Sequence, residues 1–342
     1  MVQYATMEFE RRPAHQRNPD LEILLQQING ILNPVEAAIV AKHSKPKYPS
    51  LFILGAPRSG TTLMLQWLAS THRFAYPTNL LSRFYGAPYI GALVQRLLTD
   101  PRYDFNRELF DLSPEATFQS NLGKTTGALS PHGFWYFWRR FFPLSELQPL
   151  DEAQFDPAAV RDCLAELAAV EAVFDKPLAM KGAHMNFNIP FFATMFQQAV
   201  FVYVTRHPFY NMQSLFEARL NYFGDLRAWY SGRPPEYSEL ENLDPYHQIA
   251  GQVYYTNEAV ARGLGAIEEK RFVRVNYETF CRDPRVTYSE ILDALAARGW
   301  QTDDTYSGPT SFSPTNQVRL DGGDCDRLVE AYQHFARVRL TV

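Results

Sequence analysis

Short apolar runs alternate with helical patterns along most of the chain. Two runs, at residues 49–55 and 199–204, are mostly apolar, as strands buried on both faces of a parallel sheet usually are, and a third strand is predicted at residues 271–275. Helical spacing follows each run, at residues 61–70, after Pro208 and at residues 284–298. This alternation predicts an α/β fold, with one P-loop-type domain built on a central parallel sheet flanked by helices.

The segments outside this alternation predict the domain organisation. Residues 1–48 are expected to form a helical extension, with a helix over 18–45 that is interrupted around Pro34. Residues 49–342 then form the main domain, in which 74–176 and 221–250 are predicted insertions on the substrate side. Within the second insertion, Tyr230–Tyr246 carries three prolines and many polar residues, which indicates a surface loop.

Composition narrows the classes of protein. The 342 residues are 46% hydrophobic, enough for a substantial core, and the net charge of -4 gives no general attraction to nucleic acid or acidic membranes. No signal peptide and no continuous apolar stretch of about 20 residues is evident, so we expect no membrane partner. Three widely spaced cysteines favour a reduced, cytoplasmic protein and exclude a cysteine-based zinc site.

The first chemical motif is the loop Gly55–Thr62 between a predicted strand and a predicted helix. Backbone N–H groups of such a loop, together with the positive end of the helix, bind a phosphate. A triphosphate-binding loop would carry lysine at position 61, but this chain has Thr61 there, and Arg58 is the nearby cation. The loop therefore favours a nucleotide with less charge than a triphosphate, although two glycines can also serve only to shape a turn.

The run Pro57–Thr62 resembles the 5′-phosphosulfate loop of sulfotransferases that use 3′-phosphoadenylyl sulfate (PAPS). Many members carry lysine where this chain has Arg58. The resemblance implies PAPS as the sulfuryl donor, 3′,5′-bisphosphoadenosine (PAP) as the product and no metal requirement. It places donor contacts at Arg58, Ser59, Gly60, Thr61 and Thr62.

Further segments extend the resemblance. In the family, an Arg-x-Pro motif and a serine eight residues after the arginine bind the 3′-phosphate, and Arg206 and Ser214 match this spacing. Tyr277, in a segment similar to the family's Tyr-Glu-Asp, and Phe312 are implied adenine contacts. Arg319 is the nearest candidate for a further 3′-phosphate ligand, and an ordinary loop arginine is the alternative.

The resemblance also implies catalytic residues. His184 follows Lys181 in a Lys-x-x-His segment one residue longer than the family's Lys-x-His, and histidine suits a general base near neutral pH. The alternative base is a carboxylate such as Glu115. Arg58 is expected at the bridging oxygen of the donor, Lys181 either assists there or is solvated, and His207 is expected to be structural.

The acceptor has no sequence signature. The aromatic run 134–142 is expected either to be a buried helix or to line an apolar pocket. The expected acceptor is a small molecule bearing a hydroxyl or amine, such as a bacterial secondary metabolite. Two alternatives to a sulfotransferase are a P-loop kinase or triphosphatase and a non-catalytic nucleotide-binding protein of the same fold.

Overall fold

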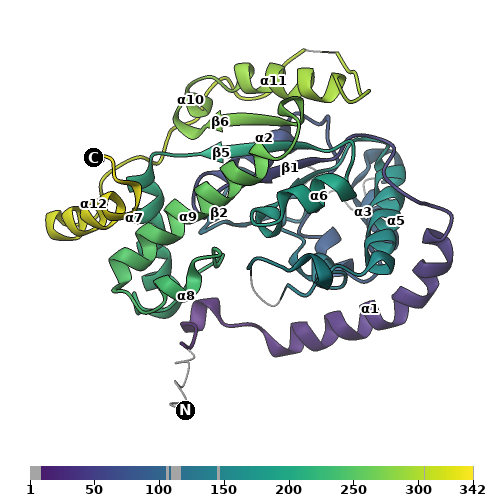
Figure 1. Ribbon diagram of the computed structural model, residues 1–342. Helices are drawn as coiled ribbons and strands as arrows, with labels where there is room; N and C mark the ends of the chain where they lie inside the picture. Colours follow the sequence, from purple (N-terminus) through teal and green to yellow (C-terminus); the bar gives the residue numbers. More distant parts are fainter. Residues whose placement is uncertain (1–8, 105–107, 109–116, 145–146, 304, 342) are drawn as a thin grey trace.

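The central sheet consists of short parallel strands. The computed structural model describes residues 9–104, 108, 117–144, 147–303 and 305–341. In these residues the sheet has the order β4 (Ala179–Lys181), β1 (Leu51–Leu54), β5 (Val200–Thr205) and β6 (Phe272–Asn276), and all its pairings are parallel (Figure 1). The predicted α/β fold is confirmed, and β1, β5 and β6 match the three predicted strands to within two residues at each end. A two-stranded antiparallel hairpin, β2 (Ser120–Asn121) and β3 (Lys124–Thr125), lies apart from the sheet.

Alternate residues of the strands build two cores on the two faces of the sheet. Leu51 and Ile53 of β1 belong to one buried cluster, whereas Phe52 and Leu54 belong to the other. This follows from the two-residue period of a strand, which sends successive side chains to opposite faces. Because both faces are covered at β1 and β5, these two strands are apolar at almost every position, whereas β6 at the edge of the sheet exposes Arg274 and Asn276.

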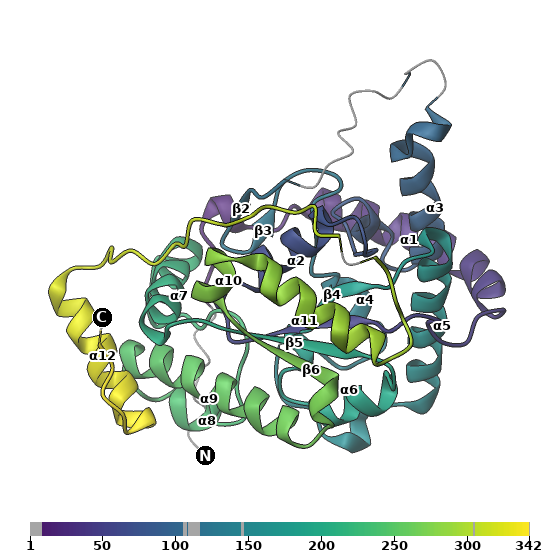
Figure 2. The same ribbon diagram turned by 90° about the horizontal axis from the view of Figure 1, so that it is seen from above.

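Helices cover both faces (Figures 1 and 2). One face packs against α2 (Thr61–Ser70), α10 (Tyr277–Arg282) and α11 (Pro284–Ala296). The other packs against α4 (Trp135–Trp138), α5 (Pro157–Phe174), α6 (Ile189–Met195) and α9 (Pro245–Gly265). A third cluster joins α9 to α7 (Pro208–Phe223) and α12 (Gly322–Ala336). The remaining helices are α3 (Pro88–Thr99) and α8 (Tyr237–Leu240), with 3-10 turns at Pro13–His15, Leu81–Phe84, Pro101–Tyr103, Glu152–Gln154, Ala183–Met185 and Glu269–Arg271.

The N-terminal helix α1 (Pro19–Val40) is continuous, so the interruption predicted around Pro34 is wrong. Side chains on both sides of the proline bind one neighbouring segment. Asn29 accepts a hydrogen bond from the N–H of Gly86, and Asn33 donates one to the carbonyl of Gly86. Glu36 accepts from the backbone N–H groups of Tyr89 and Ile90 at the start of α3. These tertiary bonds hold the helix across a residue that would otherwise break it.

The outer face of α1 is apolar, with Ile23, Leu24, Ile31 and Val35 all exposed. Among the described residues, the helical stretch Pro13–Val40 is long and apolar enough to cross a membrane, by length and composition only. Glutamine and asparagine interrupt the apolar residues of this helix, so no continuous apolar run marks it in the sequence. Core helices of soluble proteins and signal sequences meet the same criterion, so this is weak evidence for a membrane segment.

The segment Tyr230–Tyr246 is more ordered than the predicted surface loop. It contains α8 and the first turn of α9, and both Gly232 and Leu240 are buried. Gln252 of α9 donates hydrogen bonds to the carbonyls of Tyr230 and Gly232, which fixes the start of the segment. This proline-containing, polar segment is therefore folded and is held against α9.

Candidate active site

A cavity of about 560 Å³ opens where the carboxyl ends of the parallel strands meet the following loops. This edge is where α/β folds usually bind ligands, and the volume suits a small molecule. The predicted site residues that line it are Arg58, Gly60, Thr61, Thr62, Lys181, Arg206, Tyr277 and Phe312. The structure thus brings together residues from the β1–α2 loop, β4, the end of β5, the start of α10 and the C-terminal segment.

The loop from Gly55 to Thr62 needs glycine at both ends. Gly55 has φ 148° and Gly60 has φ 101°, values that other residues rarely adopt. A Cβ at Gly55 would lie 2.5 Å from the carbonyl oxygen of Val204, and a Cβ at Gly60 would lie 2.5 Å from the ring of Tyr277. Arg58 also has a left-handed φ of 68°. The loop is therefore a tight turn pressed against β5 and α10.

Side chains from three other segments hold this turn. Asn186 accepts from the N–H of Gly55 at 3.2 Å and donates to its carbonyl at 2.9 Å. Asn211 donates to the carbonyl of Pro57, and Arg206 donates to the carbonyl of Arg58. With these carbonyls occupied, the loop's conformation is set before a ligand binds. Sequence reasoning did not identify Asn186 or Asn211, although Asn211 lies only three residues after Pro208.

The charged side chains that line the cavity among the described residues are cations. Arg58 donates from Nε to the hydroxyl of Ser214 at 3.0 Å, and Lys181 donates from Nζ to Thr62 at 2.7 Å. Burial and the nearby Arg58 lower the pKa of Lys181 to about 8, and burial lowers the pKa of Arg58 itself. Neither cation forms an ion pair with a described residue, so their charges are directed at the empty space beside the loop.

Two residues that were predicted to contact the donor, Ser59 and Ser214, do not line the cavity. Ser59 is 1% exposed and does not line the cavity; its hydroxyl lies beneath the loop, where a Cβ at Gly55 would approach it to 2.7 Å, and has no hydrogen-bond partner. Ser214 is paired with Arg58 instead of Arg206 and is also outside the lining. Their backbone positions match the motif, but local packing turns both hydroxyls away from the cavity.

Arg206 sits between the loop and the C-terminal segment. Its Nε donates to Asn316, and its Nη2 donates to the carbonyl and hydroxyl oxygens of Thr315. The guanidinium group also lies 4.9 Å from the ring centre of Tyr277. Its position against the cavity fits the predicted phosphate contact, while its hydrogen bonds fix the segment that closes one side of the site.

Aromatic rings form the far end of the cavity. Tyr277 lies against Gly60 and bonds through its hydroxyl to Thr315. Phe312 stacks on Phe280 at 5.5 Å and lies 5.4 Å from Phe118, measured between ring centres. Phe118 lines the cavity and is a further candidate for stacking on a base, one that the sequence reasoning did not single out.

Arg319 is directed away from the cavity. It forms an ion pair with Glu217 through Nε and Nη2 at 2.6 and 2.7 Å, and it is absent from the lining. The alternative of a loop arginine therefore describes its geometry better than a phosphate ligand does.

His184 is also outside the cavity. It is 2% exposed, and its ring packs 4.3 Å from Trp138 and 5.5 Å from Phe192, measured between ring centres. Burial lowers its pKa to about 3, and Nε2 has no hydrogen-bond partner. The 3-10 turn Ala183–Met185 directs Ala183 to the cavity and His184 to the aromatic core. Glu115, the alternative base, lies outside the described residues.

The aromatic run 134–142 has a buried face and a cavity face. Phe134, Phe137, Trp138 and Phe142 are buried, as the core-helix alternative predicted. Trp135, Tyr136 and Arg139 line a second, larger cavity of about 1480 Å³, which shares Leu147, Tyr230 and Ser231 with the first. His132 also lines it, and burial, with Lys181 and Arg83, lowers its pKa to about 4. No group of three or more metal-ligating side chains occurs in the described part of the chain.

Comparison with known proteins identifies the family. The profile of the sulfotransferase family matches residues 49–302 of the 342. No curated protein matches the chain in sequence. The sulfotransferase STF9 from Mycobacterium avium has a similar fold, with a TM-score of 0.50 and 16% identity over 95% of this chain and 80% of that one. A sulfotransferase domain from the Synechococcus PCC 7002 olefin synthase has a TM-score of 0.42 and 19% identity over 86% and 96%.

Gly60→Ala should destabilise the fold by at least about 2 kcal/mol, because a Cβ meets the Tyr277 ring and φ is left-handed. Gly30→Ala is the matched control, since nothing lies within 4 Å of a Cβ there and the site is inside α1. That variant should gain about 0.5–1 kcal/mol. Urea denaturation measures both, and equal stability of Gly60→Ala and wild type would contradict the tight turn.

Proposed function

Because the chain belongs to the sulfotransferase family, we propose that it transfers a sulfuryl group from PAPS to a hydroxyl or amine of a small-molecule acceptor. The observation that carries the proposal is the set of unpaired cations, Arg58 and Lys181, beside a preformed phosphate loop. In the reaction, the acceptor oxygen or nitrogen forms a bond to sulfur as the bond from sulfur to the bridging oxygen breaks. The electron pair leaves with PAP, and the proton of the acceptor group passes to the surrounding water.

The geometry suggests a role for each lining residue. The backbone N–H groups of residues 60–62 and the N-terminus of α2 bind the 5′-phosphosulfate. Arg58 and Lys181 stabilise the negative charge that grows on the bridging oxygen, which is the main electrostatic demand of such a transfer. Arg206 contacts the 3′-phosphate, and Tyr277, Phe312 and Phe118 enclose the adenine. No step in this scheme requires a metal ion.

The proposal places the acceptor in the larger cavity and the reaction in the cytoplasm. Cys163, Cys281 and Cys325 are buried free thiols, which fits a reducing compartment. A bacterial secondary metabolite remains the proposed type of acceptor, and a volume of about 1480 Å³ accommodates one. The competing functions are a P-loop kinase or triphosphatase, which would prefer ATP with magnesium, and a non-catalytic nucleotide-binding protein, which would show no turnover.

PAP should raise the melting temperature without magnesium, and more than ADP or ATP does. At 100 times the dissociation constant the stabilisation would be about 2.7 kcal/mol.

Arg206→Ala should bind PAP about 10- to 100-fold more weakly and lose most of the preference for PAP over AMP, because a charge-assisted contact to the 3′-phosphate is removed. Arg206→Lys should recover part of the affinity for PAP and part of the preference over AMP.

The matched control is Arg319→Ala, which removes an arginine paired with Glu217 outside the cavity. It should leave the PAP affinity within about twofold of wild type, as expected for a residue that makes no ligand contact. Stabilisation by ATP with magnesium in preference to PAP would contradict the sulfotransferase proposal. An unchanged preference for PAP over AMP in Arg206→Ala would remove Arg206 from the 3′-phosphate site.

The affinity for PAP should fall as pH rises above about 8. Lys181 has a folded pKa lowered from 10.5 to about 8, so it is charged below pH 8 and neutral above it. An anion binds only the charged form well, so the logarithm of the dissociation constant should rise by up to about one unit per pH unit there. Calorimetric titrations from pH 7 to 9.5 measure this slope. Lys181→Arg should abolish it, and a pH-independent wild type would show that Lys181 does not contact the phosphates.

His184→Phe separates a catalytic from a structural histidine. Phenylalanine fills the same space between Trp138 and Phe192 and leaves no unpaired Nε2. We expect an equal or higher melting temperature and turnover within about threefold of wild type, assayed with labelled PAPS and an active acceptor. A loss of about 10² or more in turnover at unchanged stability and PAP affinity would instead support His184 as the base.

A further inference from the structure

The larger cavity is built partly by the N-terminal extension. Phe9, Glu10 and Arg11, followed by residues of α1, form one wall, and the segment from Arg227 to Tyr237 forms the opposite wall. The extension is anchored there. The N–H of Arg12 donates to the carbonyl of Tyr222 at 2.7 Å, and the ring of His15 stacks on Tyr222 at 4.0 Å. Residues of the N-terminal extension therefore line this cavity.

Basic side chains dominate the lining, although the whole chain carries a net charge of -4. The acidic residues of the lining are Glu10, Glu22 and Glu241, and the carboxylate of Glu22 accepts the single O–H of Tyr136, whose oxygen lies 2.8 and 2.9 Å from its two oxygens. The lysine and arginine residues are Arg11, Arg17, Arg83, Lys124, Arg139, Arg227 and Arg233. Arg227 pairs with Asp225, whereas Arg11, Arg17, Arg83, Lys124 and Arg233 form no ion pair with a described residue.

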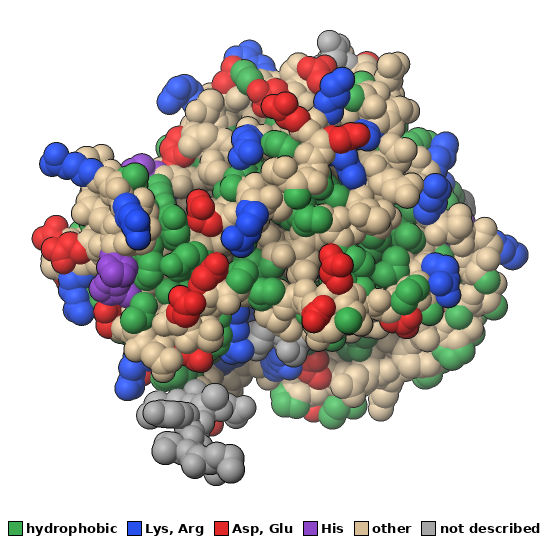
Figure 3. Space-filling view, viewed as in Figure 1, with side chains coloured by type: hydrophobic (Ala, Val, Ile, Leu, Met, Phe, Trp, Pro, Cys, Tyr) green, Lys and Arg blue, Asp and Glu red, His purple; other side chains and the backbone are tan. Residues whose placement is uncertain are grey.

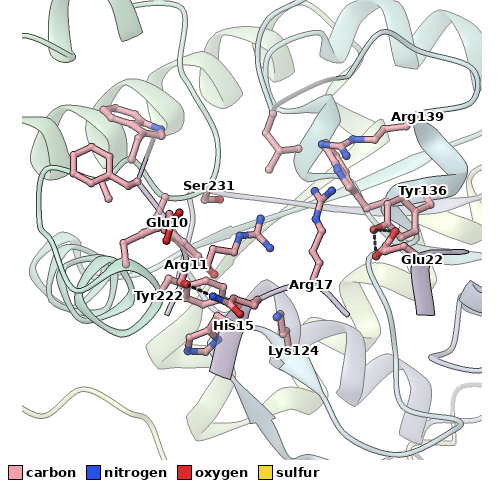
Figure 4. Close-up of a pocket in the computed structure, with 18 of the residues that line it drawn as sticks. Glu10, Arg11, His15, Arg17, Glu22, Lys124, Tyr136, Arg139, Tyr222 and Ser231 are labelled. Atoms are coloured by element: carbon pink, nitrogen blue, oxygen red, sulfur yellow. Dashed lines mark hydrogen bonds between the residues drawn. The ribbon is translucent and has the colours of Figure 1, made fainter. Parts of the chain in front are cut away.

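These charges converge. Figure 4 shows Arg17 extending its guanidinium group toward Arg139, with Arg11 directed into the same space from an earlier part of the extension. Basic side chains are also visible at the lower edge of the surface in Figure 3, between α8 and α1. Like charges at such an enclosed surface repel one another more strongly than in open water, and a bound anion relieves that repulsion.

Two histidines report the same positive potential. Burial is the largest cause of the lowered pKa of His15, and the positive charges of Lys124, Arg11 and Arg12 lower it further. At the other end of the cavity, burial lowers the pKa of His132 most, and the positive charges of Lys181 and Arg83 lower it further. The Nδ1 atom of His132 accepts from the N–H of Phe134 at 3.0 Å, so the neutral ring carries its proton on Nε2 and acts as a donor. Both pKa shifts thus have the direction that nearby positive charge produces.

We propose that the acceptor carries an oxyanion group, a carboxylate, sulfate or phosphate, and that Arg11 and Arg17 bind it in the larger cavity. The site joins the nucleotide cavity at Leu147, Tyr230 and Ser231, so an acceptor held by its anionic end can present a hydroxyl or amine at that junction. This inference rests on the proposed function. The extension thereby selects the substrate, although it lies outside the residues that match the family.

The test uses pyranine, a fluorescent phenol with three sulfonate groups, and 1-hydroxypyrene, the same ring system without them. Fluorescence anisotropy in 50 mM salt should show pyranine binding at least about tenfold more tightly than 1-hydroxypyrene. The double substitution Arg11→Gln with Arg17→Gln should weaken pyranine at least about tenfold and 1-hydroxypyrene less than twofold. Arg161→Gln removes an exposed arginine of α5 that lies outside both cavities, so it is the control for the loss of a surface positive charge and should change neither affinity.

Displacement of pyranine by 4-hydroxybenzoate and by 4-hydroxyphenyl phosphate ranks a carboxylate against a phosphate. Either compound should displace the probe more weakly from the double variant than from wild type. Equal binding of pyranine and 1-hydroxypyrene, or an equal loss in the Arg161→Gln control, would overturn the proposal.

Melting temperatures with and without PAP show whether each variant is folded and keeps its nucleotide site. Selective pyranine binding by a chain that does not bind PAP would leave the anion site standing and refute the sulfotransferase proposal. PAP binding without selectivity for pyranine would refute the anion site alone.

Discussion

The guanidinium group of Arg206 joins three segments that are distant in the sequence. It donates to the carbonyl of Arg58 in the phosphate loop, to Thr315 and Asn316 near the C-terminus, and it stacks on Tyr277 after β6. Each bond is made by a charged donor, which makes it stronger than a neutral one. One side chain therefore links the phosphate loop, the aromatic ring and the C-terminal segment to one another.

Buried positive charge is the second constraint on this site. Arg58 and Lys181 have depressed pKa values because burial disfavours their charged forms, and neither has an acidic partner among the described residues. Such an arrangement costs folding free energy in the empty protein and is offset when an anion binds. Stability and affinity are thus coupled, since the repulsion that weakens the free protein favours the ligand.

Patterns with a fixed period were predictable from the sequence. The strands 49–55, 199–204 and 271–275, the helix over 61–70 and the glycine-bounded loop all depend on local spacing, and the structure has them. The directions of individual side chains were not predictable. Ser59, Ser214 and His184 occupy the expected positions in the chain, but packing against Gly55, Arg58 and Trp138 turns them away from the cavity.

The same limit explains the elements that sequence reasoning missed or misjudged. Pro34 was expected to break α1, but the bonds of Asn29, Asn33 and Glu36 to one neighbouring segment come from parts of the chain more than fifty residues away. Asn186 likewise supports Gly55 from 131 residues away, and no local signal marks that contact.

Some residues that support the two cavities lie outside the part of the chain that matches the family. Residues 49–302 contain the sheet and the phosphate loop, yet Thr315 and Asn316, which hold Arg206, lie beyond them, and so do Arg11 and Arg17. A fragment trimmed to that span would keep the fold's framework while losing one brace of the nucleotide site and one wall of the larger cavity. Relatives that share only this span can therefore share a donor site without sharing a substrate.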